Sequence, residues 1–292
     1  MVDLTSCRPV KLGKNVVLFF PPTPLDFLDL LRRVIPVVGA TIAARGYRRG
    51  KKYESYHDSF SYYFEKISIP IKIRLPDDHI AVANWGLVKL KMLVYLVQDI
   101  FKDKIYTAFL APSSGDVVID LGAHIGLFTI SVAKFAKLVV AIEPHPENYR
   151  YLLTNVKLNK FGNVITCRLA CSDKEGTGKL YLGHHSGSHS LLFKRSSLRA
   201  IDVPLITLSK LVRGLGLNRV DFIKMDIEGA EYSVLVGASQ ILKSYDVKLA
   251  IAAYHDDDIR RKCNQLLTEL GYKVLEKRGF LYAWKPNGYK TE

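Results

Sequence analysis

The chain has 292 residues, of which 48% are hydrophobic and 24% charged, and its formal net charge is +14 at pH 7. This length and apolar content exclude a disordered or fibrous chain, and they allow one large domain or two of moderate size. The basic charge indicates either a polyanionic partner, such as nucleic acid, an acidic membrane surface or a phosphorylated substrate, or a solvated surface without one.

The four cysteines form no C-x-x-C pair, which disfavours a zinc ribbon or a thioredoxin-like site. Their number and placement are typical of a reducing compartment, so a cytoplasmic location is expected. No secretory signal is predicted at the N-terminus. The apolar stretches at 16–20 and 34–44 are too short or too interrupted by proline to span a bilayer, so no transmembrane segment is predicted.

Residues 1–105 are predicted to form an α+β extension, with a helix at 26–35, a basic run at 45–52 and an aromatic cluster at 56–64. Three interpretations of this region remain open: a surface for an anionic partner, a peripheral membrane contact, or a helical cap on the main domain. The alternation at 67–75 predicts a half-buried strand with Pro70 facing an edge. One or two helices are predicted at 87–109.

From residue 106 to 292, predicted strands and helices alternate. Strands are expected at 117–121, 138–142, 164–169, 178–182, 203–206, 220–226, 247–253, 272–276 and 280–284, and helices at 129–136, 145–158, 208–215, 230–243 and 257–270. Such alternation predicts an α/β domain, in which a mostly parallel sheet carries helices on both faces.

Acidic residues lie at the ends of four of these predicted strands or just past them: Asp120, Glu143, Asp173 and Asp226. In an open parallel sheet, ligands bind at the carboxyl ends of the strands. Gly122 would let the backbone of the turn after the first strand approach a ligand closely. The sequence therefore predicts a cofactor site at this edge of the sheet.

The glycine turn at 122–126 reads G-x-x-x-G rather than the G-x-G-x-x-G of dinucleotide sites. An acid beside that turn is poorly placed for a pyrophosphate, but it suits a positively charged cofactor. S-adenosylmethionine fits, with its amine near Asp120 or Asp226, its ribose at Glu143 and its adenine near Asp173.

These segments resemble the FkbM family of class I S-adenosylmethionine-dependent methyltransferases. The resemblance rests on residues 118–126, 141–144, 169–173 and 204–208, and most specifically on the D-x-x-K-x-D-x-E-G-x-E pattern at 221–231. It covers roughly residues 106–284. It implies a Rossmann-like fold, with a seven-stranded sheet whose last strand is antiparallel, and methylation of a hydroxyl oxygen on a sugar or secondary metabolite.

The chain departs from the family's pattern at His124, where asparagine is usual, and at 252–255, where an acid often precedes the histidine. A hydroxyl acceptor needs a base, and the predicted candidates are Glu228, His255 and His124. For Lys224 and Glu231, a buried ion pair and a direct role remain equally open. No metal site is predicted, since His184, His185 and His189 have no matched ligand nearby and read as an acceptor-side loop.

The predicted cofactor-binding residues are Asp120, Gly122, Ala123, His124, Gly126, Glu143, Pro144, Asp173 and Asp226. The leading hypothesis is an O-methyltransferase for a sugar, glycan or small metabolite. Two alternatives remain: an RNA-directed methyltransferase that uses the basic N-terminal region, and a non-catalytic binding protein that retains the fold.

Overall fold

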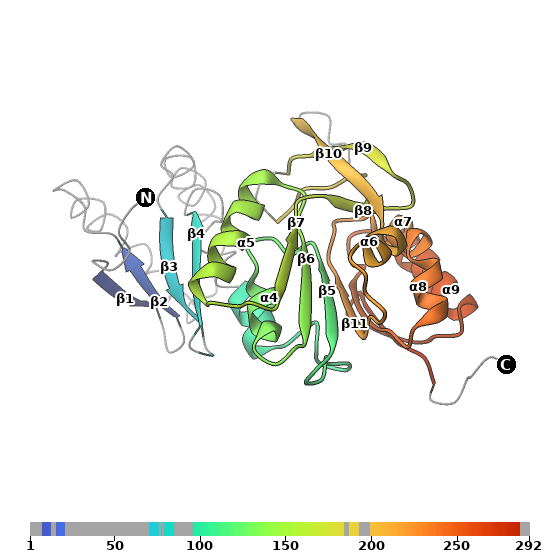
Figure 1. Ribbon diagram of the computed structural model, residues 1–292, viewed down its shortest axis with the longest axis horizontal. Coiled ribbons are helices and arrows are strands. Elements are labelled where there is room, and N and C mark those ends of the chain that lie inside the picture. The colour runs from blue at the N-terminus through green and yellow to red at the C-terminus, as the bar shows by residue number, and fades with distance from the viewer. Residues whose placement is uncertain are drawn as a thin grey trace, which may run out of the picture.

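The computed structural model describes residues 8–12, 16–20, 70–75, 77, 79–84, 96–183, 187–192 and 199–286 (Figure 1). The helix predicted at 26–35, the basic run, the aromatic cluster, and His184 and His185 lie outside these residues. No helix in the described part of the chain is long and apolar enough to cross a membrane.

A seven-stranded sheet forms the centre of the molecule, in the order β13-β14-β12-β11-β5-β6-β7 (Figure 1). Its strands are β5 (Val117–Leu121), β6 (Leu138–Ile142), β7 (Val164–Cys167), β11 (Phe222–Met225), β12 (Lys248–Ala252), β13 (Lys273–Lys277) and β14 (Phe280–Trp284). Strands β12, β11, β5, β6 and β7 pair in parallel, whereas β14 runs antiparallel to β12 and β13. The predicted fold class and the antiparallel last strand are confirmed.

Helices cover both faces of this sheet (Figure 1). They are α4 (Leu127–Ala133), α5 (Pro146–Leu158), α6 (Leu208–Gly214), α7 (Glu231–Gly237), α8 (Ser239–Ser244) and α9 (Asp257–Glu269). Successive residues of a strand point to opposite faces. On β5, Ile119 packs with the helices α6 to α9, whereas Val118 packs with Phe128 of α4. Each strand is therefore buried on both sides, as its continuous apolar sequence predicts.

A second sheet corrects two predicted boundaries. The strand expected at 164–169 divides, because β7 ends at Cys167 and β8 (Ala170–Ser172) pairs with β10 (Ala200–Thr207) instead of β6. β9 (Gly176–Tyr181) completes the order β8-β10-β9. The helix expected at 230–243 also divides, after Gly237, where a Cβ would lie 2.1 Å from the carbonyl oxygen of Ser172. This glycine allows α7 to lie directly against β8.

The N-terminal region holds four described strands where the sequence predicted one. β1 (Arg8–Leu12), β2 (Val16–Phe20), β3 (Pro70–Arg74) and β4 (Ile80–Asn84) form an antiparallel sheet in that order. Pro70 does not face a sheet edge, since β3 lies between β2 and β4. It is the first residue of β3, and the β2 pairing begins only at Lys72, so its missing N–H costs no bond to β2. The helix expected at 87–109 ends at Lys102 of η3 (Gln98–Lys102).

Asn155 of α5 and Asn159, the C-cap residue of this helix, bind the edge of β4. Asn155 accepts from the Val82 N–H at 2.6 Å and donates to the Val82 carbonyl at 3.0 Å, and Asn159 makes the same two bonds to Ile80. Each carboxamide therefore replaces one residue of a neighbouring strand. The second carboxamide hydrogen of Asn155 reaches the carbonyl of Ile125, 2.7 Å away in the glycine turn.

Candidate functional site

A cavity of about 430 Å³ opens at the carboxyl ends of β5, β6, β11 and β12. Its position and size are typical of small-molecule sites in open α/β sheets. Its lining includes the predicted residues Gly122, Ala123, His124, Glu143, Pro144, Asp226, Glu228 and His255. Three other predicted cofactor residues, Asp120, Gly126 and Asp173, do not line it.

The glycine turn takes its shape from close backbone packing. Gly122 has φ +74°, and a Cβ there would lie 2.0 Å from the carbonyl oxygen of Asp226. Gly126 has φ +89° and precedes α4, where a Cβ would lie 2.7 Å from a methyl carbon of Leu152. Gly126 is thus required for helix packing, in place of the expected cofactor contact.

Asp120 is fully buried, and both oxygens of its carboxylate face partners within the protein. Its Oδ1 lies 3.0 Å from Nζ of Lys224, and its Oδ2 accepts from the Thr129 hydroxyl at 2.6 Å. Asp120 and Lys224 are register partners in β5 and β11, and Lys224 also donates to the Gly122 carbonyl at 2.7 Å. The buried pair of Asp120 and Lys224 therefore holds the glycine turn in place through the Gly122 carbonyl. Of the two roles left open for Lys224, the structure favours the buried ion pair, but its partner is Asp120 and not Glu231.

Glu143 is almost fully buried at the end of β6, beside the turn. Its Oε2 accepts from the backbone N–H of His124 at 2.8 Å, and its Oε1 accepts from that of His145 at 2.9 Å. Burial raises the pKa of Glu143 to about 7, although these hydrogen bonds act in the opposite direction. Glu143 thus carries a carboxylate that changes charge near neutral pH.

Asp173, the fourth predicted strand-end acid, is exposed and accepts from the Ser172 hydroxyl at 2.8 Å. Since β8 joins the second sheet, the chain leaves the central sheet before residue 173. Ala170 and Cys171 of β8 line the cavity, but Asp173, the first residue after this strand, does not.

The loop after β11 presents the acids of the D-x-x-K-x-D-x-E-G-x-E pattern. Glu228 and Gly229 have φ values of 55° and 100°, which turn the backbone sharply. Oε1 of Glu231 accepts from the backbone N–H groups of Ile227 at 3.3 Å and Gly229 at 3.1 Å, so this buried side chain fixes the loop. Burial raises the pKa of Glu231 to about 7.

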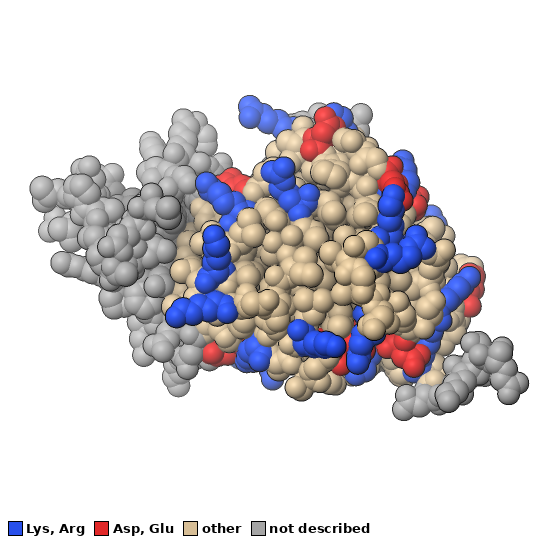
Figure 2. All heavy atoms as spheres, viewed as in Figure 1, with Lys and Arg blue, Asp and Glu red and all other residues tan. Residues whose placement is uncertain are grey.

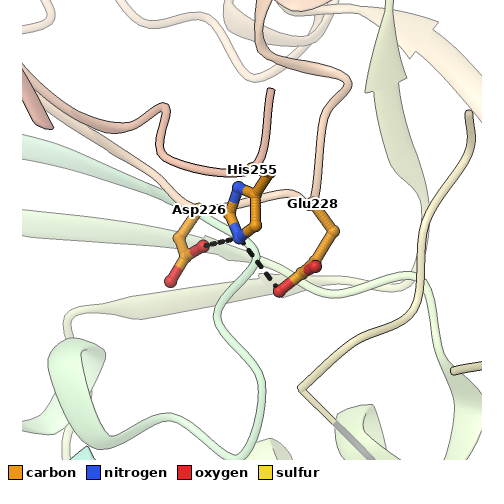
Figure 3. Close-up of side chains that lie close together, drawn as sticks. All are labelled: Asp226, Glu228 and His255. Atoms are coloured by element: carbon orange, nitrogen blue, oxygen red, sulfur yellow. Dashed lines mark ion pairs between the residues drawn. The ribbon is translucent and has the colours of Figure 1, made fainter. Parts of the chain in front are cut away.

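Asp226, Glu228 and His255 lie together on the cavity wall, and we call them the carboxylate–histidine cluster (Figure 3). Nε2 of His255 is 3.2 Å from Oε1 of Glu228 and 3.9 Å from Oδ1 of Asp226. Burial lowers the pKa of His255, but Glu228, Asp226 and Glu231 together raise it more, so it lies above its usual value. The cluster can accept a proton, bind a cation, or hold the donor groups of a substrate.

Tyr106 belongs to the site but carries no sequence signal for it. Its hydroxyl donates to Oδ2 of Asp226 at 2.5 Å, and its ring packs edge-on against Phe128 and Phe280. Burial and the charge of Asp226 raise the pKa of Tyr106 well above its usual value, so the hydroxyl keeps its proton. The residue lies 120 positions before its partner, beyond the reach of any local pattern.

The described part of the predicted acceptor-side loop borders the cavity. His189 lines it, and its ring lies 4.3 Å from that of His145. The Ser190 hydroxyl donates to the carbonyl of Glu228 at 2.6 Å. This contact joins the loop to the carboxylate–histidine cluster.

Comparison with known proteins agrees with this geometry. Over 228 residues the chain is 27% identical to methyltransferase sdnD of Sordaria araneosa. This alignment covers 67% of this chain and 86% of the relative. It is 26% identical over 230 residues to the 31-O-demethyl-FK506 methyltransferase FkbM of Streptomyces tacrolimicus, covering 65% and 85%. A shorter match, 40% identical over 87 residues, is to a tRNA(Phe) (4-demethylwyosine(37)-C(7)) aminocarboxypropyltransferase of Methanocaldococcus jannaschii; it covers 28% of this chain and 35% of that relative.

The sequence profile of the methyltransferase FkbM domain matches residues 120–282, from the buried acid of β5 to the middle of β14. This match takes in the glycine turn, the loop after β11 and His255. The chain belongs to the FkbM methyltransferase family.

Proposed function

We propose that the protein uses S-adenosylmethionine to methylate a hydroxyl oxygen of a small-molecule or glycan acceptor. The observation that carries this proposal is the distribution of acids around one cavity. Glu143 follows β6, and Asp226 and Glu228 follow β11, so carboxylates stand on either side of the glycine turn. A positively charged cofactor suits such a wall, whereas a pyrophosphate does not.

The residues present fit S-adenosylmethionine. Both oxygens of Glu143 accept backbone N–H groups, which orients the carboxylate, and an oriented acid beside a glycine turn is suited to ribose hydroxyls. Asp226, held by Tyr106, offers a charge for the amine of the cofactor. Asp120 is already paired, so Asp226 is the better of the two predicted partners for that amine.

When bound, S-adenosylmethionine supplies an electrophilic methyl carbon on a sulfonium. The protein must align the acceptor and relieve its hydroxyl of a proton. Glu228 and His255 border the cavity with proton-accepting atoms 3.2 Å apart, so we assign the acceptor to their side. His124 also lines the cavity, but its backbone N–H is bound to Glu143, on the cofactor side.

RNA is the second candidate acceptor, because the archaeal tRNA-modifying relative shares 87 aligned residues with this chain. The face shown in Figure 2 carries Lys and Arg side chains over much of its area, with Asp and Glu among them near its edges. They do not gather into one continuous basic patch on that face. A small hydroxyl acceptor therefore remains the first proposal.

The test is a methylation screen with labelled S-adenosylmethionine, offering hydroxyl-bearing metabolites, glycans and RNA as separate acceptor pools. We expect label in an oxygen-linked methyl group, identified by mass spectrometry, and loss of transfer in Glu228→Gln. Glu147→Gln, on the exposed side of α5, is the matched control and should transfer normally. Label in RNA alone would replace the proposed acceptor. Binding of S-adenosylhomocysteine without transfer to any pool would favour a non-catalytic binding protein.

A further inference from the structure

We propose that Asp226, Glu228 and His255 bind a divalent metal ion on the wall of the cavity that they line. The binding claim stands on the geometry of the cluster alone. The chemical role given to the ion rests on the proposed function.

The three side chains can share one ion. Each offers a ligand atom, and these atoms lie within 4.8 Å of one another. A six-coordinate ion with bonds of about 2.1 Å places adjacent ligands about 3 Å apart and opposite ligands about 4.2 Å apart. His255 Nε2 is already 3.2 Å from Glu228 and 3.9 Å from Asp226, so a small carboxylate rotation completes the set.

His255 provides independent evidence for a ligand. Its side chain is 10% exposed, and although Nε2 faces Oε1 of Glu228 at 3.2 Å, neither ring nitrogen has the geometry of a hydrogen bond among the described residues. A buried imidazole is ordinarily hydrogen-bonded. Its Nε2 points between Asp226 and Glu228 (Figure 3). On the other side of the ring, Nδ1 faces Oε1 of Glu231 at 3.8 Å. A carboxylate behind the distal ring nitrogen is the usual support for a metal-binding histidine.

The local charge also favours a cation. The carboxylates of Asp226, Glu228 and Glu231 surround a single imidazole, and the nearby Lys224 is occupied by Asp120. The proposed cofactor is cationic and would offset part of this charge. However, an imidazole nitrogen coordinates a metal ion but does not coordinate the ammonium or sulfonium group of this cofactor. Two carboxylates and one imidazole suit ions such as Mn²⁺.

The protein ligands leave about three coordination positions open, and all three ligand residues line the cavity. An acceptor hydroxyl bound there would have its O–H bond weakened. Its proton would pass to solvent, and the oxygen would keep the electron pair that attacks the methyl carbon. The bond from that carbon to sulfur would break, and its electron pair would leave with S-adenosylhomocysteine. Glu228 and His255 would then hold the ion instead of taking the proton themselves.

The experiment uses the full chain, stripped with a chelator and titrated with MnCl₂ while electron paramagnetic resonance measures free Mn²⁺. We expect one tight Mn²⁺ per chain. His255→Gln and Glu228→Gln should each weaken binding by about tenfold or more. Glu147→Gln should leave the affinity unchanged. Circular dichroism confirms the fold of each variant, and either folded variant alone decides the result.

Absence of Mn²⁺ binding, or wild-type affinity in either folded cluster variant, would overturn the metal site. The two proposals fail separately. If the chelated chain still binds S-adenosylhomocysteine and transfers methyl groups, the proposed function holds and the chemical role proposed for the metal ion is wrong. A chain that binds Mn²⁺ at the cluster but binds no S-adenosylhomocysteine retains the metal site alone.

Discussion

Asp120 and Asp226 stand at the same edge of the sheet, on neighbouring parallel strands, yet they reach opposite environments. Asp120 is closed off beneath the glycine turn, with Lys224 and Thr129 as partners. Asp226 follows β11 and faces the cavity with Tyr106 at its back. The surroundings of a strand-end acid therefore decide its role. Lys224 on the neighbouring strand pairs with Asp120 and makes it structural, whereas Asp226 faces the cavity and is free to contact a ligand there.

The strongest test of the supporting acid is Lys224→Ala. It leaves Asp120 buried without its cation, and breaking such a pair costs about 3–5 kcal/mol. We expect that loss in the free energy of unfolding measured with urea. The double variant Asp120→Leu with Lys224→Met should recover most of it, since it removes both charges. A loss below about 1 kcal/mol in Lys224→Ala would contradict the supporting role.

Asp226→Asn tests the other side of the comparison. The amide still accepts from Tyr106, so the fold should hold, but the charge facing the cofactor amine is gone. Losing a hydrogen bond to a charged group costs about 1.5–3 kcal/mol, so S-adenosylhomocysteine should bind about 10- to 100-fold more weakly by calorimetry. Glu147→Gln serves as the unaffected control. Unchanged affinity in Asp226→Asn would move the amine to another residue.

Glu143, a third acid at this edge of the sheet, should make the affinity for S-adenosylhomocysteine depend on pH. Its pKa is raised to about 7, so the fraction ionised falls about tenfold between pH 8 and pH 6. Ribose hydroxyls favour the ionised acceptor, so affinity for S-adenosylhomocysteine should fall as the pH drops through 7. Glu143→Gln should flatten this part of the calorimetric profile. A steep profile that survives in Glu143→Gln would assign the titration to another group.

The same shift affects stability, with a definite sign. The folded state holds the Glu143 proton up to about pH 7, whereas the unfolded chain releases it near the ordinary glutamate pKa of 4.5. Raising the pH through this window therefore lowers the free energy of unfolding. Urea denaturation of wild type and Glu143→Gln at pH 5 and pH 8 measures the difference.

The smallest expected effect is that of Tyr106→Phe. It keeps the ring contacts to Phe128 and Phe280 and removes only the hydroxyl that holds Asp226. We expect a cost of about 1 kcal/mol in unfolding free energy, well below that of Lys224→Ala. A cost as large as that of Lys224→Ala would show that both acids serve mainly as structural anchors.

Much of this architecture could be predicted from the sequence because each strand carries a local signal. β5 and β6 match their predicted ranges residue for residue, and the glycine turn follows from its two glycines and the flanking apolar runs. The pairing of Asp120 with Lys224 depends on register between distant strands. A lysine inside an apolar strand was the signal that could have found it, since a buried charge needs a partner.

The remaining differences have the same cause. β8 looks like a continuation of β7 until its partner β10, about thirty residues later, is known. Asp226, Glu228 and His255 were each predicted as site residues, but their meeting with one another and with Tyr106 joins three separate segments, which spacing along the chain does not reveal. Among the described N-terminal strands, β1 and β2 were not predicted, because the apolar run of β2 was considered only as a membrane span.

Asn155 of α5 and Asn159 at its C-cap bind the N-terminal sheet to the central part of the molecule. A chain shortened to begin after β4 would keep all seven central strands, yet Asn155, which is fully buried, would lose both of its bonds to Val82. The same carboxamide also holds Ile125 in the glycine turn. A truncation that removes this sheet would therefore also disturb the glycine turn, through Asn155.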